Sequence, residues 1–166
     1  MIQKKVCMVG WAGTGKTSLV RRFVHAKFAD KYLSTVGVKV DRKEVTAAGG
    51  PVNLLLWDIE GRDGASDLQT SYLRGASGII YVVDGTRRET FAVLTELRES
   101  VIGAVGETPA VVAFNKADLT ADWKLTDADR AAVSAHSWHV LTTSAKTGDG
   151  VEAAFQWLAE RMVAAP

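Results

Sequence analysis

The stretch Gly10-Trp11-Ala12-Gly13-Thr14-Gly15-Lys16-Thr17 decides the fold of this chain. It fits the pattern G-x-x-x-x-G-K-[ST], in which glycines let the backbone curl so that N–H groups point inward at phosphate oxygens. An apolar run over 6–9 precedes it and predicts a buried strand, and an amphipathic run over 16–25 follows it and predicts a helix. This strand–loop–helix context favours a phosphate-binding P-loop over an incidental glycine-rich turn.

The P-loop pattern assigns a separate task to each polar side chain. We expect Lys16 to supply a positive charge to the β- and γ-phosphates, and the hydroxyl of Thr17 to hold Mg²⁺. The residues expected to surround the phosphates are Ala12, Gly13, Thr14, Gly15, Lys16, Thr17 and Ser18.

Length and composition indicate an ordinary globular chain. With 166 residues and 47% hydrophobic content, we expect one domain over 1–166. Twenty basic and 19 acidic residues leave a net charge of +1, which gives no electrostatic case for nucleic acid as a partner. The single Cys7 favours a buried thiol in a reducing compartment. No secretory, membrane-spanning or lipidation signal is found, so we expect a cytoplasmic protein without a membrane anchor in this chain.

Apolar strand-like runs alternate with amphipathic helical runs along the whole chain, which predicts an α/β fold with a mixed, mostly parallel six-stranded sheet. Paired glycines at 49–50 indicate a hairpin, so this part of the sheet should be antiparallel. The expected strands lie near 5–9, 36–46, 51–59, 79–83, 110–114 and 139–143. The expected helices, about five in number, lie near 16–25, 67–73, 90–105, 127–136 and 151–163.

The segment Trp57-Asp58-Ile59-Glu60-Gly61 closes the third predicted strand. Ligands of open α/β sheets bind beyond the carboxyl ends of the strands, so this is a place where site residues are expected. We expect Asp58 to hold Mg²⁺ through water. Gly61 leaves its N–H free to approach a γ-phosphate. The pattern D-x-x-G is weak alone and gains weight because it follows a P-loop.

Two further strand ends predict recognition of guanine. In Asn115-Lys116-Ala117-Asp118, the carboxylate can accept hydrogen bonds from N1–H and the 2-amino group of guanine, and adenine offers neither donor. The stem of Lys116 can lie over the base, and Asn115 can tie the loops together. After the last strand, the backbone N–H groups of Ser144-Ala145-Lys146 could meet the carbonyl of the base.

With these five motifs in order along its whole length, the chain resembles a Ras-superfamily small GTPase, and therefore the G domain of the P-loop NTPases. Trp57 is more similar to the Rab, Arf-like or Roc branches than to Ras, and a prokaryotic Ras-like GTPase also fits. The resemblance implies that Thr35 senses Mg²⁺ and the γ-phosphate, and that Phe28 packs edge-on against the guanine. It implies Mg²⁺ and GTP or GDP as cofactor and ligand. It also implies protein effectors or regulators that read two switch segments, 27–38 and 61–74.

The resemblance implies a catalytic set of Lys16, Thr35, Gly61 and the residue after Gly61, which departs from the family. Arg62 stands where most members carry a glutamine that orients the attacking water, and arginine has no acceptor for that bond. It is either a solvated switch residue or an arginine that neutralises transition-state charge. Glu60 stands where the family prefers a small residue, and it either faces solvent or reaches Lys16 when the γ-phosphate is absent.

These departures predict slow intrinsic GTP hydrolysis and leave a second function open. The first reading is a GTP/GDP molecular switch with weak GTPase activity. The alternative is a non-hydrolysing guanine-nucleotide-binding module, either a pseudo-GTPase or a Roc-type domain of a larger protein. A P-loop kinase of small substrates is disfavoured, because its arginine-rich lid is missing and N-K-x-D would have no purpose. Outside the motifs, we expect Trp123, Trp138 and Trp157 to be packing anchors and 87–89 to be solvated.

Overall fold

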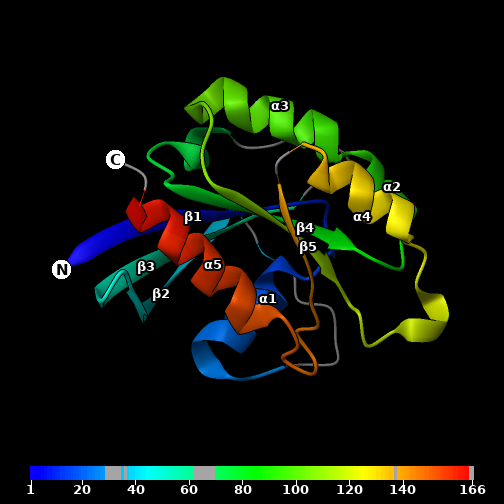
Figure 1. Cartoon of the computed structure of the whole chain (residues 1–166), viewed down its shortest axis with the longest axis horizontal. Helices are drawn as coiled ribbons and strands as arrows, with labels where there is room; N and C mark the ends of the chain where they lie inside the picture. Colours follow the sequence, from blue (N-terminus) through cyan, green and yellow to red (C-terminus); the bar gives the residue numbers. More distant parts are fainter. Residues whose placement is uncertain (29–34, 36, 62–69, 137, 165–166) are drawn as a thin grey trace.

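The computed structural model describes residues 1–28, 35, 37–61, 70–136 and 138–164. Its centre is one six-stranded sheet in the order β2-β3-β1-β4-β5-β6 (Figure 1). Every neighbouring pair is parallel except β2 and β3. The strands are β1 (Ile2–Val9), β2 (Val38–Ala47), β3 (Gly50–Ile59), β4 (Gly78–Asp84), β5 (Ala110–Asn115) and β6 (His139–Thr142). The predicted mixed, mostly parallel sheet is confirmed.

Five α-helices are found in the described part of the chain, and they cover both faces of the sheet. Figure 1 shows α1 and α5 on one face and α2, α3 and α4 on the other. The helices are α1 (Lys16–His25), α2 (Arg88–Ala92), α3 (Leu94–Val105), α4 (Asp127–Ser134) and α5 (Val151–Ala164). Two short 3₁₀ helices, η1 (Thr70–Leu73) and η2 (Thr120–Asp122), complete the elements.

The continuous apolar runs of the central strands arise because both faces of the sheet are buried. Successive residues of β4 alternate between two cores: Ile80 and Val82 pack with α1 and α5, whereas Ile79, Tyr81 and Val83 pack with α3 and α4. Each central strand therefore contributes side chains to both layers.

Short-range sequence features shape the backbone at two places. The β2–β3 hairpin turns at Ala48 and Gly49, whose φ angles of 54° and 79° are those of a two-residue type I′ turn. Helix α4 begins with a capping box, in which the side chains and backbone N–H groups of Thr126 and Asp129 bond reciprocally.

Three helix predictions need correction. The helix expected at 90–105 is two helices, α2 and α3, divided at Val93, whose φ of −88° and ψ of 0° lie at the edge of the α region. The helix expected at 127–136 ends at Ser134, because the N–H of His136 bonds to the oxygen of Val133, three residues back. Of the helix expected at 67–73, the described part is the 3₁₀ turn η1, and 67–69 lie outside the described residues.

Cys7 lies in the middle of the sheet and is completely buried. Burial raises the pKa of its thiol to about 12. In the described residues, no helix is long and apolar enough to cross a membrane.

Candidate functional site

The carbonyl oxygens of the loop between β1 and α1 are held by donors from within the chain. Lys16 Nζ donates to the oxygens of Gly10 and Trp11, both at 3.1 Å, and the hydroxyl of Thr14 donates to Trp11 at 3.0 Å. Asn115 Nδ2 donates to the oxygen of Thr14 at 3.0 Å. With its carbonyls engaged in this way, the loop can direct N–H groups to an anion.

The N-terminus of α1 is built to receive negative charge. Its N-cap is Gly15, with φ 102°, and this residue makes no side-chain capping bond. The first turn carries no acidic residue, so the first helical N–H groups and the positive end of the helix dipole face the loop. A Cβ at Gly15 would overlap the amide nitrogen of Asn115, so only glycine fits this position.

Lys16 is a buried cation at the centre of this arrangement. Burial lowers the pKa of its ammonium to about 8, the nearby Asp58 opposes that shift, and Arg87 adds to it. Gly61 approaches closely, since a Cβ there would lie 2.5 Å from Lys16 Nζ and 2.8 Å from the Cα of Ala12. The structure therefore brings the predicted Lys16, Ala12 and Gly61 together.

The three residues predicted to hold Mg²⁺ form one cluster. The hydroxyls of Thr17 and Thr35 both bond Asp58 Oδ2, with 3.1 Å from Thr35, and they also contact one another. Asp58 is 1% exposed, and burial raises the pKa of its carboxyl while hydrogen bonds from Thr17 and the charge of Lys16 act against that rise. Among the described residues, its buried Oδ1 has no hydrogen-bond partner. An orphaned carboxylate oxygen beside two hydroxyls fits a hard divalent cation.

The two loops predicted to recognise guanine are tied to one another. The hydroxyl of Thr143 donates to Asn115 Oδ1 at 3.1 Å, and the N–H of Ala117 donates to the oxygen of Thr143 at 3.0 Å. The hydroxyl of Ser144 donates to Asp118 Oδ1 at 2.8 Å. Because Asn115 also donates to the oxygen of Thr14, its side chain links the loop between β1 and α1 to the loop that follows β6.

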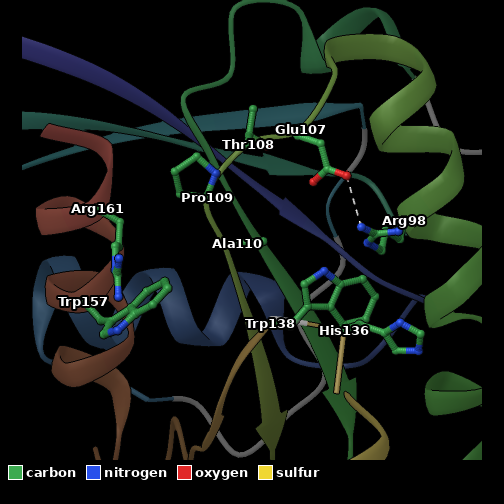
Figure 2. Close-up of a pocket in the computed structure, with 9 residues that line it drawn as sticks. All are labelled: Arg98, Glu107, Thr108, Pro109, Ala110, His136, Trp138, Trp157 and Arg161. Carbon is green, nitrogen blue, oxygen red and sulfur yellow. Dashed lines mark hydrogen bonds and ion pairs between the residues drawn. The ribbon is translucent and has the colours of Figure 1, made fainter. Parts of the chain in front are cut away.

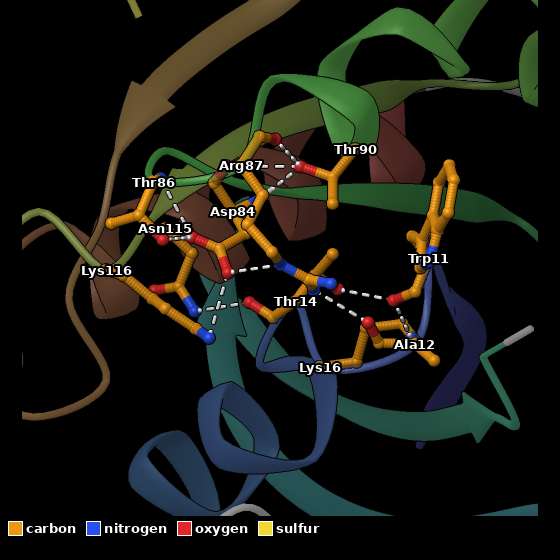
Figure 3. Close-up of polar contacts among 10 residues, drawn as sticks. All are labelled: Trp11, Ala12, Thr14, Lys16, Asp84, Thr86, Arg87, Thr90, Asn115 and Lys116. Carbon is orange, nitrogen blue, oxygen red and sulfur yellow. Dashed lines mark hydrogen bonds and ion pairs between the residues drawn. The ribbon is translucent and has the colours of Figure 1, made fainter. Parts of the chain in front are cut away.

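The turn after β4 contributes residues that the sequence analysis did not assign. Asp84 ends a buried strand, as Asp58 and Asn115 do, so the strand-end rule could have identified it. Its carboxylate pairs with Lys116 Nζ at 2.9 Å and with Arg87 Nε at 3.0 Å (Figure 3). The expectation that 87–89 is solvated is confirmed for Arg88 and Glu89, which are exposed, and Arg88 pairs with Asp129 at 2.8 Å at the surface. It is wrong for Arg87, which is partly buried and donates to the oxygen of Ala12 in the loop between β1 and α1.

Other predicted site residues lie at the margin of this cluster. Phe28 follows α1 and is 38% exposed, so its ring is available for a ligand to cover. Ala145 is buried and Lys146 is exposed. The N–H of Glu60 donates to the oxygen of Gly37 at 2.7 Å. Arg62 lies outside the described residues.

A hollow of about 320 Å³ lies at the other end of the sheet, at the starts of β5 and β6 (Figure 2). Arg98 lies over the ring of Trp138, and Arg161 lies over the ring of Trp157. Trp138 also stacks on Tyr81, and Trp157 stacks on His139, which confirms both tryptophans as packing anchors. Of the predicted site residues that the structure describes, none lines this hollow.

Comparison with known proteins agrees with the geometry. The model of the Ras family matches residues 5–164. The chain is 36% identical over 162 residues to the Ras-related protein Rab-4A of Rattus norvegicus and to that of Homo sapiens, covering 96% of this chain and 74% of each relative. It is 35% identical over 162 residues to Rab-4A of Danio rerio, covering 96% of this chain and 76% of the relative.

Proposed function

The chain belongs to the Ras family of small GTPases and is Rab-like, and on that premise we propose that residues 1–166 form one guanine-nucleotide-dependent switch that hydrolyses GTP slowly. The observation that carries this proposal is the link through Asn115. One buried amide joins the loop suited to phosphates to the loop suited to guanine. A single ligand that has a guanine at one end and phosphates at the other fits both loops.

Base selectivity rests on Asp118 in this proposal. Its carboxylate accepts the N1–H and 2-amino donors of guanine, and Ser144 orients it. Adenine would leave that carboxylate without donors, which costs affinity for ATP and ADP. The stem of Lys116 lies along the base, and the backbone at Ala145 and Lys146 meets the carbonyl of the base. Phe28 covers the edge of the ring.

Mg²⁺ would be held by Thr17, Thr35 and Asp58, where the unpartnered Oδ1 of Asp58 supports a cation. The ion would neutralise charge on the phosphates. Lys16 and the N–H groups over 13–18 would bind the phosphate oxygens, and the N–H of Gly61 would approach the γ-phosphate. Contact with that phosphate through Thr35 and Gly61 would order the two switch segments, 27–38 and 61–74, for protein effectors or regulators.

The most direct test of this function compares the affinities of nucleotides that differ only in the base. Isothermal calorimetry with GDP, ADP and XDP should give binding of GDP at least about 100-fold tighter than ADP. Asp118→Asn should weaken GDP and improve XDP, because xanthine presents a C2 oxygen to which the amide N–H₂ can donate. Equal affinity of the native protein for GDP and ADP would refute the proposal.

Hydrolysis is the step on which the second candidate function differs. Arg62 cannot accept a hydrogen bond from the attacking water, which favours a guanine-nucleotide-binding module without turnover. Phosphate release under multiple-turnover conditions separates a slow GTPase from that module. In single-turnover hydrolysis, a gain in Arg62→Gln indicates lost water positioning, whereas a loss assigns Arg62 itself to catalysis.

A further inference from the structure

Arg87 connects the two halves of the site from the turn between β4 and α2. We propose that Arg87 is a positioning residue for two loops. It holds the loop between β1 and α1 at the carbonyl of Ala12, and through Asp84 it connects that loop to Lys116, in the loop that follows β5. The inference rests on the proposed function and adds a second link to the one that Asn115 makes.

The guanidinium of Arg87 donates two hydrogen bonds in different directions. Its Nη2 donates to the oxygen of Ala12 at 2.7 Å, and its Nε donates to Asp84 Oδ2 at 3.0 Å (Figure 3). A planar guanidinium presents both donors at fixed angles, so the position of Asp84 sets the position of the Ala12 peptide. Lysine, which carries a single point of charge, cannot make both contacts with the same geometry.

Asp84 is a suitable pivot because it is 1% exposed and fully engaged. Its Oδ1 accepts from the N–H and the hydroxyl of Thr86, at 2.9 and 2.6 Å. Its Oδ2 lies between Arg87 and Lys116, which come from different loops. A buried carboxylate is stable only when cations pair with it. A displacement of either Arg87 or Lys116 therefore changes the interaction of Asp84 with the other cation.

The carbonyl of Ala12 is an effective point of control. A trans peptide is planar, so fixing this C=O toward Arg87 turns the N–H of Gly13 to the opposite side. Lys16 already holds the carbonyls of Gly10 and Trp11. Arg87 thus fixes the next peptide of a loop whose N–H groups are proposed to bind phosphate oxygens.

The turn that carries Arg87 is itself fixed in place. The hydroxyl of Thr90 bonds the backbone of Asp84 and of Arg87. The indole of Trp123 packs so closely on Gly85 that a Cβ there would overlap its ring. Arg88, the first residue of α2, pairs with Asp129 on α4. Arg88 is therefore a matched control, because it carries the same side chain at the neighbouring position and its ion pair is with α4.

The test measures release of a fluorescent GDP from the full chain with Mg²⁺, chased by excess GDP. Arg87→Ala should release it about tenfold faster than the native protein, and Arg88→Ala should stay within about twofold. Arg87→Lys should recover part of the loss by pairing with Asp84. Arg87→Gln should recover part of the loss by donating to the carbonyl of Ala12. If Arg87→Ala does not fold, the release rates of Arg87→Lys and Arg87→Gln test the inference in its place.

A double-mutant cycle distinguishes a positioning role of Arg87 from a general contribution to stability. If Arg87 and Lys116 act through Asp84, the release rate of Arg87→Ala/Lys116→Ala should depart by at least about threefold from the product of the single effects. Multiplicative effects, or equal rates for Arg87→Ala and Arg88→Ala, would overturn the inference while the native protein still selects GDP. A native protein that does not select GDP over ADP would instead overturn the proposed function.

Discussion

The two ends of the sheet use cationic side chains in opposite ways. At the carboxyl ends, the buried Lys16 and the partly buried Arg87 donate to backbone oxygens, and Arg87 also pairs with the buried carboxylate of Asp84. At the amino ends, Arg98 and Arg161 lie over indole rings, and Arg98 also pairs with the exposed carboxylate of Glu107 (Figure 2). Burying polar groups costs free energy unless every group is bonded, whereas surface stacks cost and contribute little. The comparison teaches that the carboxyl end is organised for a ligand and the amino end for packing.

The largest effect of a substitution at the carboxyl end of the sheet is expected at Asn115. Asn115→Ala leaves the oxygen of Thr14 and the hydroxyl of Thr143 without their buried partner, which should cost about 2 kcal/mol of unfolding free energy. GDP affinity should fall on the order of 30-fold, because both loops lose their tie. Urea denaturation and calorimetry measure the two effects. An unchanged affinity would show that the loops are aligned without Asn115.

Removal of Mg²⁺ should come next in size. A chelator should speed GDP release by about tenfold in the native protein, because removal of the cation leaves the negative charges of Asp58 and the phosphates without neutralisation. Asp58→Asn should release GDP quickly with or without the chelator. Stopped-flow fluorescence measures both rates. Equal chelator sensitivity of the two proteins would place the ion elsewhere.

A smaller effect is expected at the amino end. Arg161→Ala removes the cation over Trp157 and should change the free energy of unfolding by about 0.5 kcal/mol. GDP affinity should stay as in the native protein, since Arg161 lies at the other end of the sheet. Thermal denaturation with and without GDP tests both statements. A loss of GDP affinity would contradict the division between the two ends.

The smallest effect should appear only as a dependence on pH. Hydrogen bonding from Arg88 holds the pKa of Asp129 well below its usual range, so their pairing stabilises the fold above the ordinary pKa of an aspartate. That contribution is lost as pH falls below about 4. The urea midpoints of Arg88→Ala and the native protein should therefore differ slightly at pH 7, and the difference should shrink steadily as the pH falls below about 4. A constant difference would assign the effect to packing.

Much of the fold could be predicted because the strands alternate cleanly with amphipathic helices and both sheet faces are buried. The strand-end rule also brought Asp58, Asn115 and Ser144 to one edge of the sheet. The same rule places Asp84 at this edge, because that residue ends an equally buried strand. Contacts of Arg87 could not be predicted, because a long polar side chain looks the same in sequence whether it meets water or a carbonyl 75 positions away. The break at Val93 was also hidden, since helical periodicity continues through it.

The position of Cys7 has a practical consequence for work with this protein. Its thiol is shielded by the sheet and holds its proton far above neutral pH, so oxidants and alkylating reagents meet no thiolate in the folded state. It is also the chain's single cysteine. A cysteine introduced at an exposed position would be the one that reacts, so spectroscopic labels can be attached site by site without altering the native sequence elsewhere.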